Sequence, residues 1–313
     1  MQLMGNVHKL IEQHGADVVR RMDFPRAVVD AAAGYMSAEE RDLFLFTGWA
    51  QAALPHRKLE DDAHWEISND HVTLIVQPGL QKIDGDVVPV GVPYGSRARL
   101  ILLYLQTEAL RLNSREVELG RSMNHWLSRL GVPLGGEGAR SVRDQANRLS
   151  RCRLTFELQR GGRAGLLNQN IVDSALFLSA DERQGSLALE TARLSEGFFN
   201  QLKAHAMPVD EAAIREISNN SLAIDVYLWL AFRLRSLSKP TPITWRAMKA
   251  QFGQGVTRLD NFRTHYRKAL ELALSVYPDA RVEEDTSGLI LHPSRPPVSA
   301  VAVSMAGTKR LST

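Results

Sequence analysis

The stretch ARSVRDQANRLSRCRLTFELQRGGR, residues 139–163, decides the fold of this chain. Its first half places Val142, Ala146 and Leu149 along one stripe of a helix and leaves basic and amide side chains on the remaining surface. Its second half has strand composition and ends in a turn at 160–163, where two glycines stand between two arginines. A helix with a basic face, followed directly by a β-hairpin with a basic tip, is typical of the end of a winged-helix module.

The segments on either side supply the other elements of such a module. Upstream, Ser96 is expected to cap an apolar helix, residues 115–119 alternate as a short strand, and Ser122 is expected to cap a second helix. Downstream, the strand at 152–159 is expected to pair across the turn with a second strand near 171–178. Helix, strand, helix, helix and β-hairpin is the order of elements in a winged helix.

The same order recurs later in the chain, in a shorter form. A capped apolar helix precedes a short extended segment, a second helix, a glycine turn and a long third helix, and a hairpin closes the series. These elements are expected at residues 220–237, 241–245, 246–252, 258–277 and 281–292. The predicted fold class is therefore α+β, mainly helical, with two tandem winged-helix domains (helix-turn-helix plus β-hairpin) and an N-terminal extension.

The length of 313 residues exceeds the usual size of one hydrophobic core, so several domains are expected. Near the start, Ser37 and Glu40 have capping-box spacing and predict a helix that runs through Phe46, while residues 71–76 have strand composition. The Pro/Ser/Ala-rich end lacks apolar periodicity. The predicted domains are an N-terminal extension, a first winged-helix domain, a second one and a flexible tail, at residues 1–92, 93–207, 208–292 and 293–313.

Charge is arranged in blocks along the chain. Residues 1–92 carry 8 Lys/Arg and 14 Asp/Glu, whereas residues 93–163 carry 13 and 6. Residues 164–232 carry 4 and 9, and residues 233–268 carry 9 with a single acid. Two basic blocks separated by an acidic one indicate two contacts with a polyanion. The alternative is a solvated helical face, although such faces usually mix both signs.

The third helix of a helix-turn-helix enters the major groove, where Arg suits guanine and Asn or Gln suits adenine. The base-reading candidates are Arg143, Gln145, Asn147 and Arg148 in the first domain and Asn261, Arg263 and Arg267 in the second. Arg258 and Thr264 belong to the same face of the long helix expected at 258–277. The phosphate candidates are Arg140, Arg151 and Lys268, and the candidates on the hairpin are Arg160 and Arg163. For any one arginine, the alternative is a surface salt bridge or a solvated side chain. Two reading helices predict a site of roughly 20 bp and binding that weakens steeply with salt.

Motifs for other chemistry are missing. The sequence has no phosphate-binding P-loop, no G-x-S-x-G elbow and no H-E-x-x-H helix. The single cysteine, Cys152, excludes an internal disulfide and predicts a buried small hydrophobe. No apolar run reaches the roughly 18 residues of a membrane span. The expectation is a cytoplasmic, nucleoid- or plasmid-associated protein that is not an enzyme and needs no cofactor, metal or membrane.

Several blocks resemble the plasmid-encoded RepA replication initiators. They lie at residues 92–110, 114–123, 144–149, 152–156, 224–230 and 262–267, and the resemblance spans about residues 65–292. It implies binding to direct repeats (iterons) in double-stranded plasmid origin DNA, local opening of the duplex, and recruitment of the host initiator and replicative helicase. It also implies a homodimer that represses its own promoter. The first 62 residues do not match, which leaves dimerisation and partner contacts open.

Other classes of function compete with an initiator. A winged-helix transcriptional repressor without initiation activity needs the same DNA-binding features. A nicking endonuclease needs a catalytic tyrosine beside a metal, but Tyr94, Tyr104, Tyr227, Tyr266 and Tyr277 all fall in segments interpreted as structural. A protein-interaction scaffold predicts no salt-sensitive binding to duplex DNA.

Overall fold

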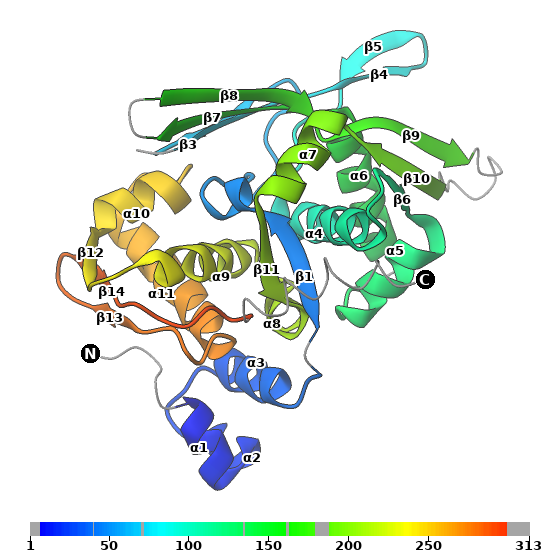
Figure 1. The fold of residues 1–313 in the computed structure, drawn as a ribbon. Coiled ribbons are helices and arrows are strands. Elements are labelled where there is room, and N and C mark those ends of the chain that lie inside the picture. The colour runs from blue at the N-terminus through cyan, green and yellow to red at the C-terminus, as the bar shows by residue number, and fades with distance from the viewer. Residues whose placement is uncertain are drawn as a thin grey trace, which may run out of the picture. The chain divides into compact units, whose positions relative to one another are not determined.

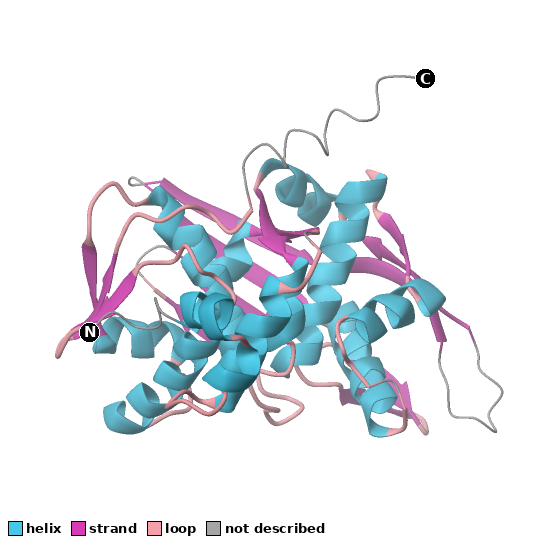
Figure 2. Ribbon diagram, turned by 90° about the horizontal axis from the view of Figure 1, so that it is seen from below, coloured by secondary structure: helices cyan, strands magenta, loops and turns pink. Residues whose placement is uncertain are grey.

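The computed structural model describes residues 7–39, 41–69, 72–133, 135–160, 163–178 and 188–298, which form two compact units (Figure 1). The inserted unit is Phe44–Ala206. The discontinuous unit combines Met1–Leu43 with Met207–Thr313. The chain passes from one unit to the other in strands β1 (Asp42–Phe46) and β11 (Ala206–Asp210). Both units mix helices with short strands (Figure 2).

The inserted unit contains three sheets and four α-helices among its described residues. Its helical elements are η1 (Thr47–Ala50), α4 (Gly95–Leu112), α5 (Gly120–Arg129), α6 (Glu137–Arg151) and α7 (Glu196–Ala204). Its strands are β2 (Trp65–Ser68), β3 (Val72–Gln77), β4 (Leu80–Ile83), β5 (Asp86–Pro89), β6 (Glu116–Glu118), β7 (Arg153–Arg160), β8 (Arg163–Asn170), β9 (Val172–Leu178) and β10 (Ala188–Leu194). The sheets have the orders β2-β3-β7-β8, β6-β10-β9 and β4-β5.

The predicted order helix, strand, helix, helix and strand is confirmed as α4, β6, α5, α6 and β7. The predicted caps are wrong: α4 begins at Gly95 without a side-chain cap, and Ser122 lies inside α5. The strand predicted near 171–178 is confirmed as β9, but its predicted pairing across the turn is wrong, because β7 pairs with β8 from Arg153↔Asn170 to Arg160↔Arg163. Residues 163–170 carry Gly and Asn, which are poor strand formers, and their pairing with β7 overrides that propensity.

The expected separate extension over residues 1–92 also needs correction. Strand β3, predicted at 71–76, pairs with β7, so the segment before residue 93 completes the sheet of the inserted unit. A hairpin by itself is marginally stable, and two further strands give it a face that can be buried. On that face Phe156 packs edge-on against Phe46 and Trp49, with ring centroids 5.6 and 5.2 Å apart. Cys152 is buried as expected, and burial raises the pKa of its thiol to about 12.

The discontinuous unit is mainly helical. Its helical elements are α1 (Val7–His14), α2 (Ala16–Val19), α3 (Arg26–Met36), α8 (Glu211–Ile217), α9 (Ser221–Arg233), η2 (Leu234–Ser236), α10 (Trp245–Phe252) and α11 (Leu259–Ser275). Strands β12 (Thr241–Thr244), β13 (Val282–Glu284) and β14 (Gly288–Leu291) form a sheet in the order β12-β14-β13. The five elements expected between residues 220 and 292 are all confirmed.

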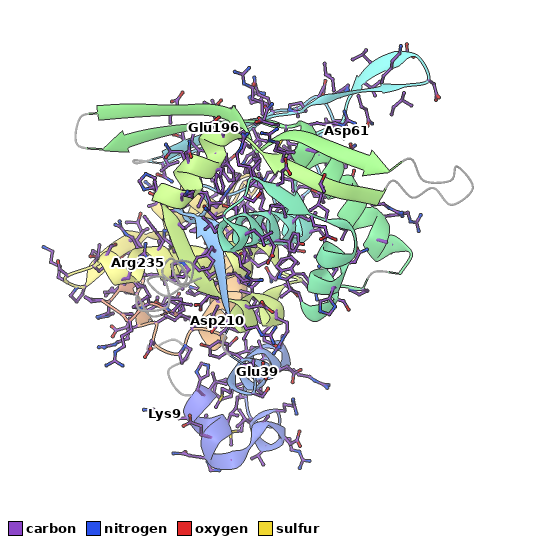
Figure 3. All side chains as sticks on the ribbon, turned by 45° about the vertical axis from the view of Figure 1, so that its right-hand side comes forward. Lys9, Glu39, Asp61, Glu196, Asp210 and Arg235 are labelled. Atoms are coloured by element: carbon purple, nitrogen blue, oxygen red, sulfur yellow. The ribbon has the colours of Figure 1, made fainter. Side chains whose placement is uncertain are left out.

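Polar side chains cap the first turns of three helices of this unit, α8, α9 and α10. The Asn220 side chain accepts from the Ala223 N–H at 3.0 Å to start α9, and Thr244 accepts from the Ala247 N–H at 3.2 Å to start α10. Asp210, labelled in Figure 3, accepts from the Ala212 N–H at 2.8 Å to start α8. These side chains satisfy N–H groups that have no partner within the helix.

Residues 7–36 belong to this unit, since α1 and α3 pack within it. Helix α3 contacts α8 and α11, and the buried residues Val7, Val28 and Val29 share a cluster with Leu272 of α11. The helix predicted from Ser37 through Phe46 is wrong, because Ser37 ends α3 and residues 42–46 form β1. The Leu and Phe residues of that segment alternate between more and less buried positions, which suits a strand.

The predicted flexible tail is described only in its first part. Residues 293–298 are anchored, since the Tyr277 hydroxyl donates to the Arg295 carbonyl at 2.6 Å. The rest of the predicted tail lies outside the described residues. Among the helices of the described chain, none is long and apolar enough to cross a membrane.

Candidate nucleic-acid interface

Helix α6 carries the first predicted base-reading face. Val142, Ala146 and Leu149 are buried, as the sequence pattern predicted. Arg140 and Arg151 are exposed, and Arg143 is half-buried. The helix therefore packs by its apolar stripe and leaves three arginines with access to solvent.

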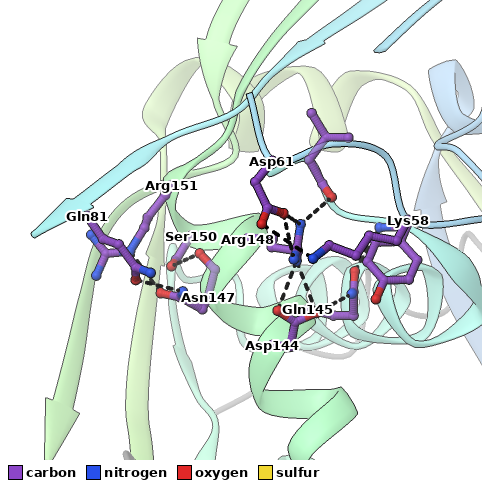
Figure 4. Close-up of polar contacts among 11 residues, drawn as sticks. Lys58, Asp61, Gln81, Asp144, Gln145, Asn147, Arg148, Ser150 and Arg151 are labelled. Atoms are coloured by element: carbon purple, nitrogen blue, oxygen red, sulfur yellow. Dashed lines mark hydrogen bonds and ion pairs between the residues drawn. The ribbon is translucent and has the colours of Figure 1, made fainter. Parts of the chain in front are cut away.

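Gln145 and Arg148, predicted as base-reading residues, are corrected to structural residues. Gln145 accepts from the Tyr94 N–H at 2.7 Å and donates to Asp144 at 2.8 Å (Figure 4). Arg148 donates from Nε to Asp144 at 2.9 Å, reaches Asp61 at 3.3 Å, and lies 5.3 Å from the centre of the Tyr94 ring. Only 2% of Gln145 and 5% of Arg148 are exposed, so neither side chain can reach a base in this conformation.

Two residues that lie near Arg148 in space, Asp144 and Gly91, account for this burial. Asp144 stands one helical turn before Arg148, a spacing that favours an ion pair on the helix surface. Gly91 has a φ of +75°, and a Cβ there would overlap the Arg148 guanidinium. The loop at Gly91 can therefore close over the arginine only because this position lacks a side chain.

Asn147 and Arg151 link α6 to the β4-β5 hairpin. The Asn147 amide nitrogen donates to Gln81 at 3.2 Å, and its oxygen accepts from Arg151 Nε at 2.8 Å (Figure 4). Arg151 also donates to the Leu80 carbonyl at 3.3 Å. Both ends of the Asn147 amide are thus engaged within the protein, which makes it a positioning residue in this conformation. Arg151 remains exposed beside it.

The hairpin candidates Arg160 and Arg163 are neighbours across the turn. They occupy the last residue of β7 and the first residue of β8 and face each other in the register. Their side chains lie outside what the structure describes, so a contact with DNA stays a prediction for both.

Helix α11 carries the second predicted face, with its apolar side buried as predicted. Phe262, Tyr266, Leu270 and Ala273 are buried. The exposed candidates on or beside this helix are Arg258, Asn261, Thr264 and Lys268. This face is therefore more open than that of α6.

Arg263 and Arg267, one helical turn apart on α11, share the indole of Trp245. Their guanidinium carbons lie 5.5 and 5.3 Å from the ring centre, within the range of cation–π attraction. Arg267 also donates from Nε to Glu284 on β13 at 2.8 Å, with a second contact from Nη2 to the same oxygen. This hydrogen bond raises the pKa of Arg267 above its usual value.

Trp245 and Glu284 were not among the predicted site residues. Trp245 gave no separate signal for a site, because it belongs with Met248 and Phe252 to the buried apolar stripe of α10. Glu284 gave no signal in the sequence, because it is brought to Arg267 by the pairing of β13 with β14. Within the described residues, no group of three His, Cys, Asp or Glu side chains could hold a metal ion.

Part of the chain matches a known protein family. Residues 92–246 match the profile of the family described as plasmid encoded RepA protein. This match supports a RepA-type replication initiator family for that region of the chain. The RepA region runs from the segment before α4 to the start of α10, so it contains α6 and Trp245 and ends before α11. This match supports a role as a replication initiator.

Two solved structures are similar to the chain. A crystal structure of domains 2 and 3 of RctB aligns with a TM-score of 0.52 and 13% identity, and covers 81% of this chain and 99% of that one. A second crystal structure, of RctB domains 2-3, aligns with a TM-score of 0.47 and 13% identity over 78% and 94%. The first likeness shows a shared mixed α/β fold. No curated protein matched the chain.

Proposed function

We propose that this protein initiates plasmid replication by binding direct repeats (iterons) in the origin as double-stranded DNA. The observation that carries the proposal is that the matched RepA region contains a helix, α6, with solvent-accessible arginines, while a second such helix, α11, follows it. We infer that α4–β8 and α9–β14 are two winged helices with α6 and α11 as their reading helices, because the order of elements in both segments supports it.

Fewer residues are proposed to contact DNA than the sequence predicted. The proposed set leaves out Gln145 and Arg148, and it treats Asn147 as a positioning residue. The proposed DNA contacts are Arg140, Arg143, Arg151, Arg160 and Arg163 in the inserted unit and Arg258, Asn261, Arg263, Thr264, Arg267 and Lys268 in the discontinuous unit. Arg, Asn and Thr supply donors for base edges and phosphates, and binding should weaken with salt as counterions are released.

A gel-shift titration at two salt concentrations tests the proposal, with duplex carrying the direct repeats beside the gene and a scrambled duplex. Arg143→Ala and Arg267→Ala should each weaken binding to the repeats by about 10-fold or more, as expected for loss of a bidentate base contact. Arg26→Ala is the control, because Arg26 lies on α3 with 84% of its side chain exposed. Equal binding of the wild type to both duplexes would refute sequence-specific binding.

Initiation itself needs a separate test. We propose that the protein opens the origin and recruits the host initiator and replicative helicase, that it acts in the cytoplasm as a plasmid-associated homodimer, and that it needs no cofactor. A plasmid with the origin and this gene should replicate in the host, and Arg267→Ala should abolish replication while the protein level is unchanged. If the protein binds the repeats but never supports replication, the winged-helix repressor is the better description.

We further propose that the protein is not a nicking enzyme. Tyr104, Tyr227, Tyr266 and Tyr277 are buried, and burial raises the pKa of the last three above the usual value for tyrosine. Burial of the neutral hydroxyl is the opposite of what a nucleophile needs. Purified protein with magnesium should leave a supercoiled origin plasmid intact; conversion to the open circle would contradict this proposal.

A further inference from the structure

Glu284 is an acid on the face that α11 is proposed to present to DNA. Its side chain is 15% exposed, and its carboxylate accepts twice from Arg267, which is itself 43% exposed. A carboxylate in such a place opposes the approach of phosphates. Glu284 therefore does not increase the affinity of α11 for DNA, and its contact with Arg267 needs another explanation.

The contacts of Arg267 leave one edge of its guanidinium available. Glu284 engages Nε and Nη2, and the Trp245 ring covers one face. A guanidinium can grip guanine O6 and N7 through its two terminal nitrogens. The acceptor and the ring thus hold the group in one orientation while leaving its second terminal nitrogen, Nη1, without a contact to Glu284.

Arg148 has the same kinds of partners as Arg267, but its side chain is buried. It too has carboxylates and an aromatic ring, from Asp144, Asp61 and Tyr94, but only 6% of its side chain is exposed. Arg267 has one hydrogen-bonded carboxylate, that of Glu284, and one ring, and its side chain is about seven times more exposed. The partners therefore fix an arginine in both units, and of these two arginines Arg267 is the one that keeps access to solvent.

We propose that Glu284 is a specificity-determining residue that positions Arg267 to read guanine. This inference rests on the proposed binding of repeated sites. The fixed orientation reduces the side-chain entropy lost on binding the correct sequence. At a sequence without the guanine acceptor, the acid remains close to the DNA without a compensating contact, which disfavours that sequence.

The test compares Glu284→Ala with Glu283→Ala, a matched control that removes the same charge from the neighbouring, exposed position of β13. Affinities are measured for the repeat duplex and for a scrambled duplex, with full-length protein whose folding is checked by thermal unfolding. Glu284→Ala should lower the ratio of the two affinities by roughly 5- to 20-fold, as expected for loss of a bidentate base contact. Glu283→Ala should change that ratio by less than about twofold, because a rim charge acts on both duplexes alike.

Two further variants separate positioning from charge. Glu284→Gln keeps an oxygen acceptor for Arg267 without the charge and should restore the affinity ratio to within about threefold of the wild type. In an Arg267→Ala background, Glu284→Ala should lower the ratio no further, since the residue it positions is gone.

The outcomes are distinct. If Glu284→Ala strengthens binding to both duplexes equally, as a lost charge would, Glu284 has no positioning role and the inference fails. The same holds if it lowers the ratio in the Arg267→Ala background. If the wild type itself does not distinguish the repeats, the proposed function fails first and the inference falls with it.

Discussion

At the scale of the residue, each unit contains an arginine that contacts both carboxylate and aromatic side chains, but one of these arginines is buried and the other is partly exposed. Arginine, carboxylate and aromatic ring meet around both Arg148 and Arg267, and exposure alone separates a residue that holds the fold from one that can contact a ligand. A count of arginines on a helix cannot make this distinction, because it depends on what closes over each side chain.

Arg148 should therefore matter for stability in a way that Arg140 does not. Arg148→Ala removes the buried partner of Asp144 and Asp61, and we expect a loss of about 2–3 kcal/mol, less than for a fully buried pair because both carboxylates are partly exposed. Arg140→Ala, at an exposed position, should change stability by no more than about 0.5 kcal/mol.

Urea unfolding followed by circular dichroism measures both variants. Equal stabilities would show that Arg148 is not held as described. A large loss of DNA binding by Arg148→Ala without any loss of stability would return it to the set of base-reading residues.

At the scale of the element, the sequence predicted several helices from local patterns, although the caps at Ser96 and Ser122 and the helix from Ser37 were wrong, and it missed contacts between distant segments. The helices α6 and α11 followed from apolar spacing, and the starts of α9 and α10 from Asn220 and Thr244, all of which act within a few residues. The pairing of β3 with β7 and the contact of Glu284 with Arg267 join segments that no short pattern relates. For that reason the sheet around the hairpin and the burial of Gln145 and Arg148 could not be predicted.

Helix α1 should respond to pH through His8. The ring nitrogen Nε2 lies 2.8 Å from the Ser275 carbonyl on α11, and burial lowers the pKa of His8 below its usual 6.5, partly offset by this hydrogen bond and by Glu12. Because the folded pKa is the lower one, the stability contributed by neutral His8 is complete above pH 6.5 and is lost as the pH falls through the folded value.

Thermal unfolding at about pH 7.5 and about pH 5 checks this expectation. The melting temperature should fall less on acidification in His8→Gln than in the wild type, whereas His14→Gln, at the exposed end of α1, should behave like the wild type. Identical losses in all three proteins would show that His8 does not control the docking of α1.

At the scale of the whole molecule, one unit is a continuous stretch of chain and the other is not. Phe44–Ala206 contains its own sheets, its own aromatic cluster and the face of α6. Produced alone, this fragment should fold cooperatively and bind DNA with a much shallower dependence on salt than the full chain, because it retains only one set of phosphate contacts.

Circular dichroism melting and salt titrations of the fragment beside the full protein provide the measurement. A broad, non-cooperative transition would show that the inserted unit needs the rest of the chain. A salt slope equal to that of the full protein would show that α11 adds no phosphate contacts.

The division of the chain also sets the order in which the protein can be assembled during its synthesis. At about 5–20 residues per second, the ribosome needs on the order of 10–30 s to translate Phe44–Ala206. Throughout that interval α1 and α3 have already been translated, while α8 and α11, against which they pack, do not yet exist. The inserted unit can therefore be complete while the apolar side of α3 is still uncovered, and the start of the nascent chain is the part that most needs protection by a chaperone.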